Sequence, residues 1–154
     1  MSCDGLRAKL DPENLHAQCF SSSHAASENG KRFEIIRPGK LGVCKVRVDG
    51  CLITNQAIRK CDYFFGVATD PESYFLVELK GSDLSTAVSQ LESTYDQLRG
   101  RIEADPRQFT AVVVSSMVPA KSNAVFRTMQ AKLLKNRGLN IDLKNVFYQV
   151  RIQS

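Results

Sequence analysis

Two aromatic-rich runs separated by a short polar segment dominate the pattern of apolar and polar positions between residues 60 and 81. Residues 63–68 and 74–79 are mostly apolar, and the segment between them contains Asp70-Pro71. Such a pattern is typical of two strands joined by a tight loop. We therefore expect a β-hairpin folded about Asp70, a fold that brings Asp62 opposite Glu78.

Further apolar patterns predict strands before and after this hairpin. The alternation in 43–48 indicates a half-buried strand, and Asp49-Gly50 after it is a strong hairpin-turn signal. The nearly continuous apolar run 109–116 indicates a central strand buried on both faces, parallel to the strand that contains Glu78. The expected strands outside the hairpin are 32–37, 43–48, 51–53, 109–116 and 146–152.

Helical periodicity follows the hairpin directly. Apolar residues spaced three and four apart predict a helix from Asp83 to about Arg101 or Ala104, and a second helix is expected over 122–136 with Gly138 as its C-cap. The first 32 residues have the least regular pattern. There, Asp11-Pro12 is a plausible helix start, because Asp favours the N-cap and Pro the first helical position.

The resulting order is helix, strands, helix, strand, helix, strand. It predicts an α/β (α+β) fold with one central mixed sheet flanked by helices. The length of 154 residues suits a single domain. We expect residues 1–32 to form an N-terminal helical and loop segment and 33–154 to form the core.

Charged residues at the end of these apolar strands are the candidate chemistry. Side chains alternate along a strand, so Glu78 and Lys80 share one face, and Asp62 lies across from them on that face. Two opposed carboxylates repel each other unless a cation lies between them. Mg²⁺ is typically held by one or two carboxylates. The alternative interpretation is an ordinary solvated face of a half-buried sheet.

Asp62, followed after fifteen residues by Glu78-Leu79-Lys80 at the end of an apolar strand, resembles the motif of the PD-(D/E)XK nuclease superfamily. This superfamily includes restriction endonucleases and Holliday-junction resolvases. The resemblance implies that Asp62, Glu78 and the Leu79 carbonyl bind Mg²⁺ or Mn²⁺, that Lys80 assists the nucleophilic water, and that cleavage leaves a 5′-phosphate. Cys61 stands where the family usually has Pro.

The resemblance extends to the order of elements over residues 43–152, which is similar to the αβββαβ core of the restriction-endonuclease-like fold. Some members carry Gln-x-x-x-Tyr on the following helix. Here Gln90 is present, but Tyr95 comes one residue too late. A helix near the N-terminus usually supplies another Glu, and Glu13, Glu28 and Glu34 remain equal candidates for it.

Composition favours a polyanionic partner. The net charge is +5, and 43% of residues are hydrophobic, which suits a globular protein that binds nucleic acid, and we expect that nucleic acid to be DNA. Positive side chains concentrate on and beside the last predicted helix, where a phosphate-binding role competes with simple complementation of the helix dipole. The candidate nucleic-acid contacts, besides Gln90, are Lys60, Lys121, Arg127, Lys132 and Lys135.

The five cysteines include no Cys-x-x-Cys pair, and we expect them to be reduced. No apolar run reaches the roughly 20 residues of a membrane helix, and the first ten residues contain no apolar signal region. These features predict a cytoplasmic protein without membrane contact.

The sequence therefore predicts a Mg²⁺-dependent endonuclease that hydrolyses phosphodiester bonds of DNA. One alternative is a non-catalytic module of the same fold that binds nucleic acid or protein. Another is a small-molecule or partner-binding domain whose Glu78 and Lys80 are surface charges. A homodimer is expected if both strands of a duplex are cut, because one site cuts one strand and twofold symmetry is the commonest arrangement.

Overall fold

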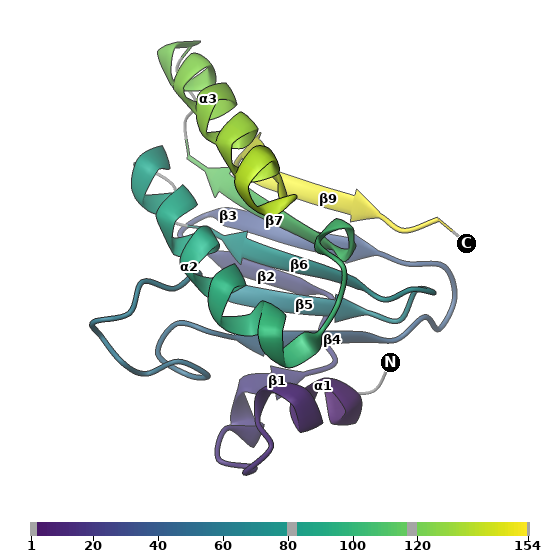
Figure 1. The fold of residues 1–154 in the computed structure, drawn as a ribbon. Helices are drawn as coiled ribbons and strands as arrows, with labels where there is room; N and C mark the ends of the chain where they lie inside the picture. The colour runs from purple at the N-terminus through teal and green to yellow at the C-terminus, as the bar shows by residue number, and fades with distance from the viewer. Residues whose placement is uncertain (1–2, 80–82, 117–119, 154) are drawn as a thin grey trace.

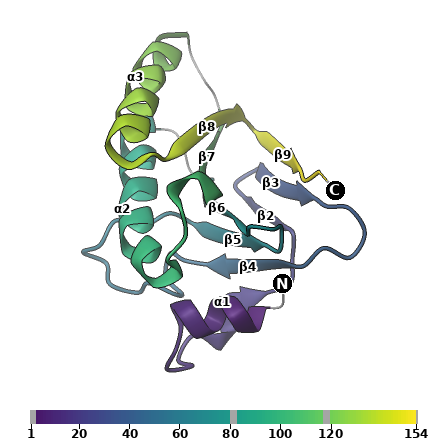
Figure 2. The same cartoon turned by 45° about the vertical axis from the view of Figure 1, so that its right-hand side comes forward.

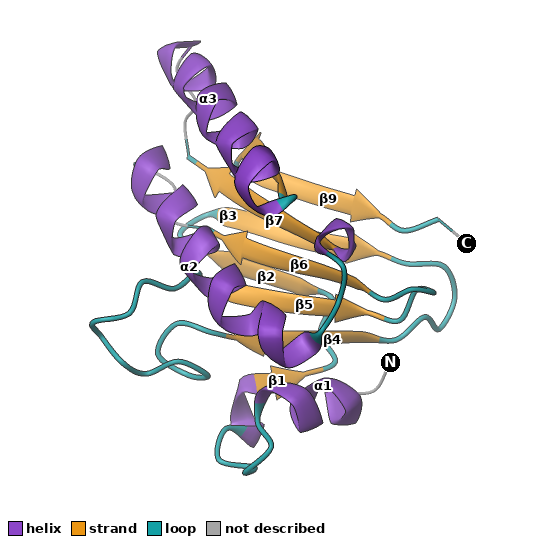
Figure 3. Cartoon of the chain, viewed as in Figure 1, coloured by secondary structure: helices purple, strands orange, loops and turns teal. Residues whose placement is uncertain are grey.

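The computed structural model describes residues 3–79, 83–116 and 120–153 and arranges them in three layers (Figures 1 and 3). The elements of these residues, in chain order, are α1 (Cys3–Leu10), η1 (Ala17–Cys19), β1 (Phe20–Ser21), β2 (Ala25–Glu28), β3 (Lys31–Ile36), β4 (Val43–Arg47), β5 (Tyr63–Val67), β6 (Ser73–Glu78), α2 (Leu84–Ile102), η2 (Pro106–Gln108), β7 (Phe109–Ser115), α3 (Ala120–Arg137), β8 (Asn140–Asn145) and β9 (Phe147–Arg151).

The central layer is a mixed sheet, as the sequence predicts. Within the described residues its six strands follow the order β1-β4-β5-β6-β7-β8. The neighbours β4, β5 and β6 are antiparallel, whereas β6, β7 and β8 are parallel. The expected hairpin and the expected parallel pairing of the Glu78 strand with the strand after α2 are therefore both confirmed.

The two faces of this sheet are covered differently (Figure 2). One face packs against α1, α2 and α3 in a core that contains Phe64, Leu76 and Leu91. The other face packs against a second sheet of order β2-β3-β9, with Phe33 and Phe65 between them. The expectation of helices on both faces is wrong for the described residues, because the small sheet buries the second apolar face.

The C-terminal region forms two strands where one was expected over 146–152. Strand β8 joins the main sheet beside β7, and β9 joins the small sheet parallel to β3. Val146 separates them with a φ of 67°. A β-branched residue in this left-handed region breaks the extended backbone, so the chain passes from one sheet to the other.

Two further expectations, one at Asp11 and one at residues 51–53, are also wrong. No helix begins at Asp11; instead α1 ends at Leu10, and the Asp11 carboxylate accepts the N–H groups of Leu15 and His16 in the loop that follows. Residues 51–53 form no returning strand. The chain turns back at once, with the Ile53 N–H donating to the Val48 carbonyl, and β4 pairs with β5 instead.

The long helices follow the sequence closely. The Asp83 carboxylate accepts the Thr86 N–H and caps α2, and Gly138, with a φ of +68°, ends α3. The guanidinium of Arg137 lies 2.9 Å from carboxylate oxygens of Glu92 and Asp96, which fixes α3 against α2. Among the described helices, none combines the length and the apolar character of a membrane-spanning segment.

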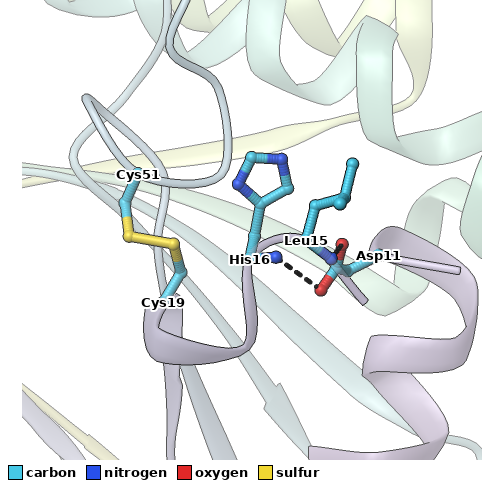
Figure 4. The surroundings of a disulfide bond; sticks show 5 residues. All are labelled: Asp11, Leu15, His16, Cys19 and Cys51. Carbon is cyan, nitrogen blue, oxygen red and sulfur yellow. Dashed lines mark hydrogen bonds between the residues drawn. A yellow bond between two sulfur atoms is a disulfide. The ribbon is translucent and has the colours of Figure 1, made fainter. Parts of the chain in front are cut away.

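Two disulfides tie the N-terminal segment to the main sheet, so the expectation of five reduced thiols is wrong. Cys3 of α1 pairs with Cys44 of β4, and Cys19 pairs with Cys51 in the turn after β4 (Figure 4). The fifth cysteine, Cys61, is a buried free thiol. Spacing alone could not indicate these bonds, because the partners lie 41 and 32 residues apart.

We expect the double variant Cys19→Ser/Cys51→Ser to lose about 2–4 kcal/mol of unfolding free energy, because the bond restricts the unfolded chain. Urea unfolding of the oxidised protein would measure this loss. Alkylation of the unfolded, unreduced wild type provides the control and should label Cys61 alone. Labelling of all five cysteines without a reductant would contradict the two bonds.

Candidate metal centre

The structure brings Asp62 and Glu78 to the same end of two neighbouring strands. Tyr63 of β5 pairs with Val77 of β6, so the next positions along the two strands, Asp62 and Glu78, face each other. The hairpin register expected from the sequence is therefore confirmed. This end of the sheet is where β6 finishes and α2 begins (Figure 1).

Both carboxylates are buried. The exposed fraction is 5% for Asp62 and 1% for Glu78. The interpretation of these two residues as a solvated surface face is therefore wrong. Burial of two opposed carboxylates is costly unless positive charge compensates them, which makes this end of the hairpin a candidate cation site.

Backbone contacts fix the Asp62 side chain. Its Oδ2 accepts the N–H of the fully buried Leu79 at 2.9 Å, so the carboxylate adds one bond between the two chain segments just beyond the β5–β6 ladder. The Asp62 carbonyl accepts the Val48 N–H at 3.0 Å. Asp62 is thus held beside Leu79, whose carbonyl the family resemblance assigns to the metal.

Helix α2 is attached to the candidate site through Thr94. The Thr94 hydroxyl oxygen accepts the Cys61 N–H at 2.8 Å and donates to the Gln90 carbonyl at 2.9 Å. The turn that contains Gln90 therefore lies beside the chain that leads into Asp62. Tyr95 is fully buried and packs edge-on against Phe109, so it belongs to the core.

The Cys61 thiol is buried next to Asp62 in the chain. Burial raises the pKa of Cys61, and the charges of Glu78 and, to a smaller extent, Asp62 raise it further. Both carboxylates are therefore within electrostatic reach of the same buried sulfur. A thiol under these conditions stays protonated, and its S–H donates to the Tyr63 carbonyl at 3.4 Å.

The donor set suits a hard cation. Carboxylate oxygens are the ligands that Mg²⁺ prefers, and two of them are enough when water or phosphate oxygens complete the shell. Across the described parts of the chain, no group of three or more His, Cys, Asp and Glu side chains could hold a metal. Lys80, the third residue of the expected motif, lies outside the described residues.

The three candidates for an additional glutamate are distributed over other parts of the molecule. Glu13 lies in the exposed loop after α1, and Glu28 lies on β2 of the small sheet. Glu34 lies on β3, where it accepts hydrogen bonds from Arg32 and Gln149, and these bonds lower its pKa. The structure therefore joins none of these three to a metal-binding group.

The expected nucleic-acid contacts fall into two groups. Lys60 is buried, and its Nζ donates to the carbonyls of Asn55 and Ile58, so it closes the loop before Asp62. Three others line one shallow hollow of about 430 Å³ on the exposed side of α3: Arg127, Lys132 and Lys135. The side chain of Lys121 lies outside the described part of the chain.

Positive charge near Lys45 is a second feature that the sequence pattern did not indicate. Burial and then the charges of Arg32 and Arg47 lower the pKa of Lys45, so both guanidinium groups lie within electrostatic reach of its ammonium. The Lys45 Nζ lies 4.9 Å from the centre of the Tyr63 ring, one residue from Asp62. The alternation along β4 could have indicated that Lys45 and Arg47 share one face. It could not indicate Arg32, because Arg32 lies on β3 of the small sheet.

No protein-family model, curated protein or solved structure matches this chain. The candidate site is therefore defined by its own geometry.

We expect Asp62→Ala to lower the unfolding free energy by about 1–3 kcal/mol, because the buried Leu79 N–H loses its acceptor. The matched variant Asp62→Asn keeps a carbonyl oxygen at that position and should lose clearly less. Urea unfolding in metal-free buffer measures both. Equal losses in the two variants would contradict the structural role of this bond.

Proposed function

We propose that this protein is a metal-dependent nuclease similar to the PD-(D/E)XK superfamily. One observation carries the proposal: two carboxylates, each more than nine-tenths buried, lie opposite each other at one end of β5 and β6. Their positions in the sequence match the Asp and Glu of the family motif. A purely structural role would not require two negative charges to be buried side by side.

The fold supports the proposal at a coarser level. If β1, β2 and β3 are set aside, α1, β4, β5, β6, α2 and β7 follow the order αβββαβ of the restriction-endonuclease-like core. The sheet carries the two carboxylates on its helical side, the side on which α2 and α3 pack. Helix α3 thus presents its positive side chains on the same side of the sheet as the candidate site.

Each residue has a defined role in this proposal. Asp62 and Glu78 hold the cation together with the Leu79 carbonyl, and the Leu79 N–H keeps the Asp62 carboxylate in position. Lys80 orients the attacking water. When bound, Mg²⁺ would polarise the scissile phosphate and activate a coordinated water.

The positive side chains supply affinity for the nucleic-acid backbone. Arg127, Lys132 and Lys135 face solvent around one hollow, an arrangement suited to phosphate groups. Contacts of this kind contribute affinity but no sequence preference. The substrate proposed is therefore DNA bound through its backbone.

A second candidate function is a non-catalytic module that binds nucleic acid. The observation in its favour is that Glu13, Glu28 and Glu34 lie away from Asp62 and Glu78, so the described residues offer two acidic ligands and no third. Such a module would bind DNA through α3 without cutting it. The cleavage assay below separates the two functions.

We expect the wild type to bind Mn²⁺ and to cut supercoiled plasmid, leaving 5′-phosphate ends. Glu78→Gln removes one charged ligand at constant shape, and we expect metal affinity to fall about 10-fold or more and the cleavage rate about 100-fold or more. Calorimetric titration of Mn²⁺ and agarose-gel cleavage measure the two effects.

Glu72→Gln is the matched control, because Glu72 is exposed in the loop of the same hairpin, and it should leave both quantities unchanged. If Glu78→Gln and the wild type bind Mn²⁺ equally, the proposed metal centre is wrong. If the wild type binds Mn²⁺ and DNA but never cuts, the non-catalytic module is the correct function.

We expect the triple variant Arg127→Gln/Lys132→Gln/Lys135→Gln to bind DNA more weakly. The slope of log K against log salt should decrease by about 2–3, one unit for each lost phosphate contact. The control Lys9→Gln/Lys40→Gln/Arg151→Gln removes the same charge from exposed positions elsewhere. Fluorescence anisotropy across a salt series measures both, and identical slopes for the two variants would exclude α3 as the contact.

A further inference from the structure

Strand β8 forms one edge of the main sheet. It pairs with β7 on one side, and among the described residues no strand pairs with its other side. Backbone groups of successive strand residues point to opposite sides. The Val146 N–H donates to the Ser115 carbonyl of β7. The backbone N–H and C=O groups of Asp142 and Lys144 therefore also point to β7. The backbone groups that point outward are those of Ile141, Leu143 and Asn145.

Contacts from α3 agree with this assignment. The Ile141 carbonyl accepts a hydrogen bond from the Gln130 side chain at 2.8 Å, and Gln130 belongs to α3 and not to β7. A groove of about 520 Å³ runs between α3 and this edge. Its walls are Phe126, Arg127 and Gln130 of α3 and residues 142–145 of β8.

We propose that a second copy of this chain pairs with β8 as an antiparallel strand, centred on Leu143. The sequence of β8 is complementary to itself in this register. Asp142 then lies opposite Lys144 of the other copy, and Lys144 lies opposite its Asp142. Opposite charges on directly opposed strand positions stabilise the pairing, and this arrangement provides two such pairs.

The same register also matches the backbone groups. Leu143 faces its own symmetry mate, and Ile141 faces Asn145, so every outward N–H and C=O meets a partner. The new contact can supply about six backbone hydrogen bonds. The cost is the loss of the Gln130 contact with Ile141 in each copy, since the neighbouring strand takes that carbonyl.

Neighbouring side chains hold the two charges in place. The Tyr148 hydroxyl donates to the Asp142 carboxylate at 2.6 Å, and the Lys144 Nζ lies 5.8 Å from the centre of the Tyr148 ring. Both charged groups therefore lie on the same face of β8, around one aromatic ring. A carboxylate can accept further hydrogen bonds, so the bond from Tyr148 leaves Asp142 able to pair with Lys144 across the strands.

A lysine on an edge strand usually prevents pairing with other chains. In this register each Lys144 meets an Asp142, so the charge that repels a wrong partner favours a second copy. The pairing makes one continuous sheet across a twofold axis, and both copies keep their helices on the same side. It concerns assembly alone and does not depend on the proposed metal centre.

Sedimentation equilibrium and light scattering of the wild type test the proposal. We expect twice the chain mass of 17.1 kDa at high concentration. Asp142→Lys and Lys144→Asp each place like charges opposite each other, and each should raise the dissociation constant about 10-fold or more. An equimolar mixture of the two variants restores opposite charges at both pairs, and it should regain the dimer.

Tyr148→Phe is the control, because it removes the hydrogen bond to Asp142 and keeps both charges, so the dimer should persist. If circular dichroism shows that a charge variant is unfolded, Leu143→Pro replaces it, because the Leu143 N–H points outward and the bonds to β7 remain. A monomeric wild type at all concentrations, a dimer unaffected by these variants, or a mixture that stays monomeric would each overturn the proposal.

Discussion

The antiparallel pairing of β5 with β6 determines the geometry of the candidate metal centre. Both strands are buried on both faces, with Phe64 and Leu76 toward the helices and Phe65 toward the small sheet. A slip of one residue would exchange the two faces, so both cores enforce a single register. The same register places Asp62 opposite Glu78. The accuracy of the polar site is therefore a consequence of hydrophobic packing on either side of it.

Elements with strong local patterns were predictable from the sequence. Helix α2 has a continuous apolar stripe and an Asp83 cap, and β7 is long, apolar and bounded by turn signals, so local information was sufficient for both. The strands β1, β2 and β8 are short or polar, and their existence depends on partners elsewhere in the chain. Distant partners also decide residues 51–53. The Asp49-Gly50 turn signal suggested a returning strand there, but the structure has a tight turn and the Cys19–Cys51 bond.

In the candidate site, too, some features could be predicted from the sequence and others could not. The opposition of Asp62 and Glu78 could be predicted, because it requires only counting along one hairpin. The contact of Thr94 with the Cys61 backbone spans 33 residues and joins a helix to a loop, so no periodicity indicated it. The effect of the Arg32 charge on Lys45 depends on the small sheet, which the sequence pattern did not indicate. Contacts between layers are thus the part that the sequence pattern does not show.

The parallel pairing of β3 with β9 has a consequence for the order in which the chain can fold. Side chains of Glu34 and Gln149, 115 residues apart, meet in this sheet, so the sheet cannot be completed until nearly the whole chain is available. Until then, only β2 and β3 can cover the face of the main sheet that carries Phe65 and Val77, because Tyr148 and Val150 of β9 are still missing. During synthesis the part of this apolar surface that β9 covers stays accessible to chaperones and to other chains, and we expect it to close late because it depends on distant contacts.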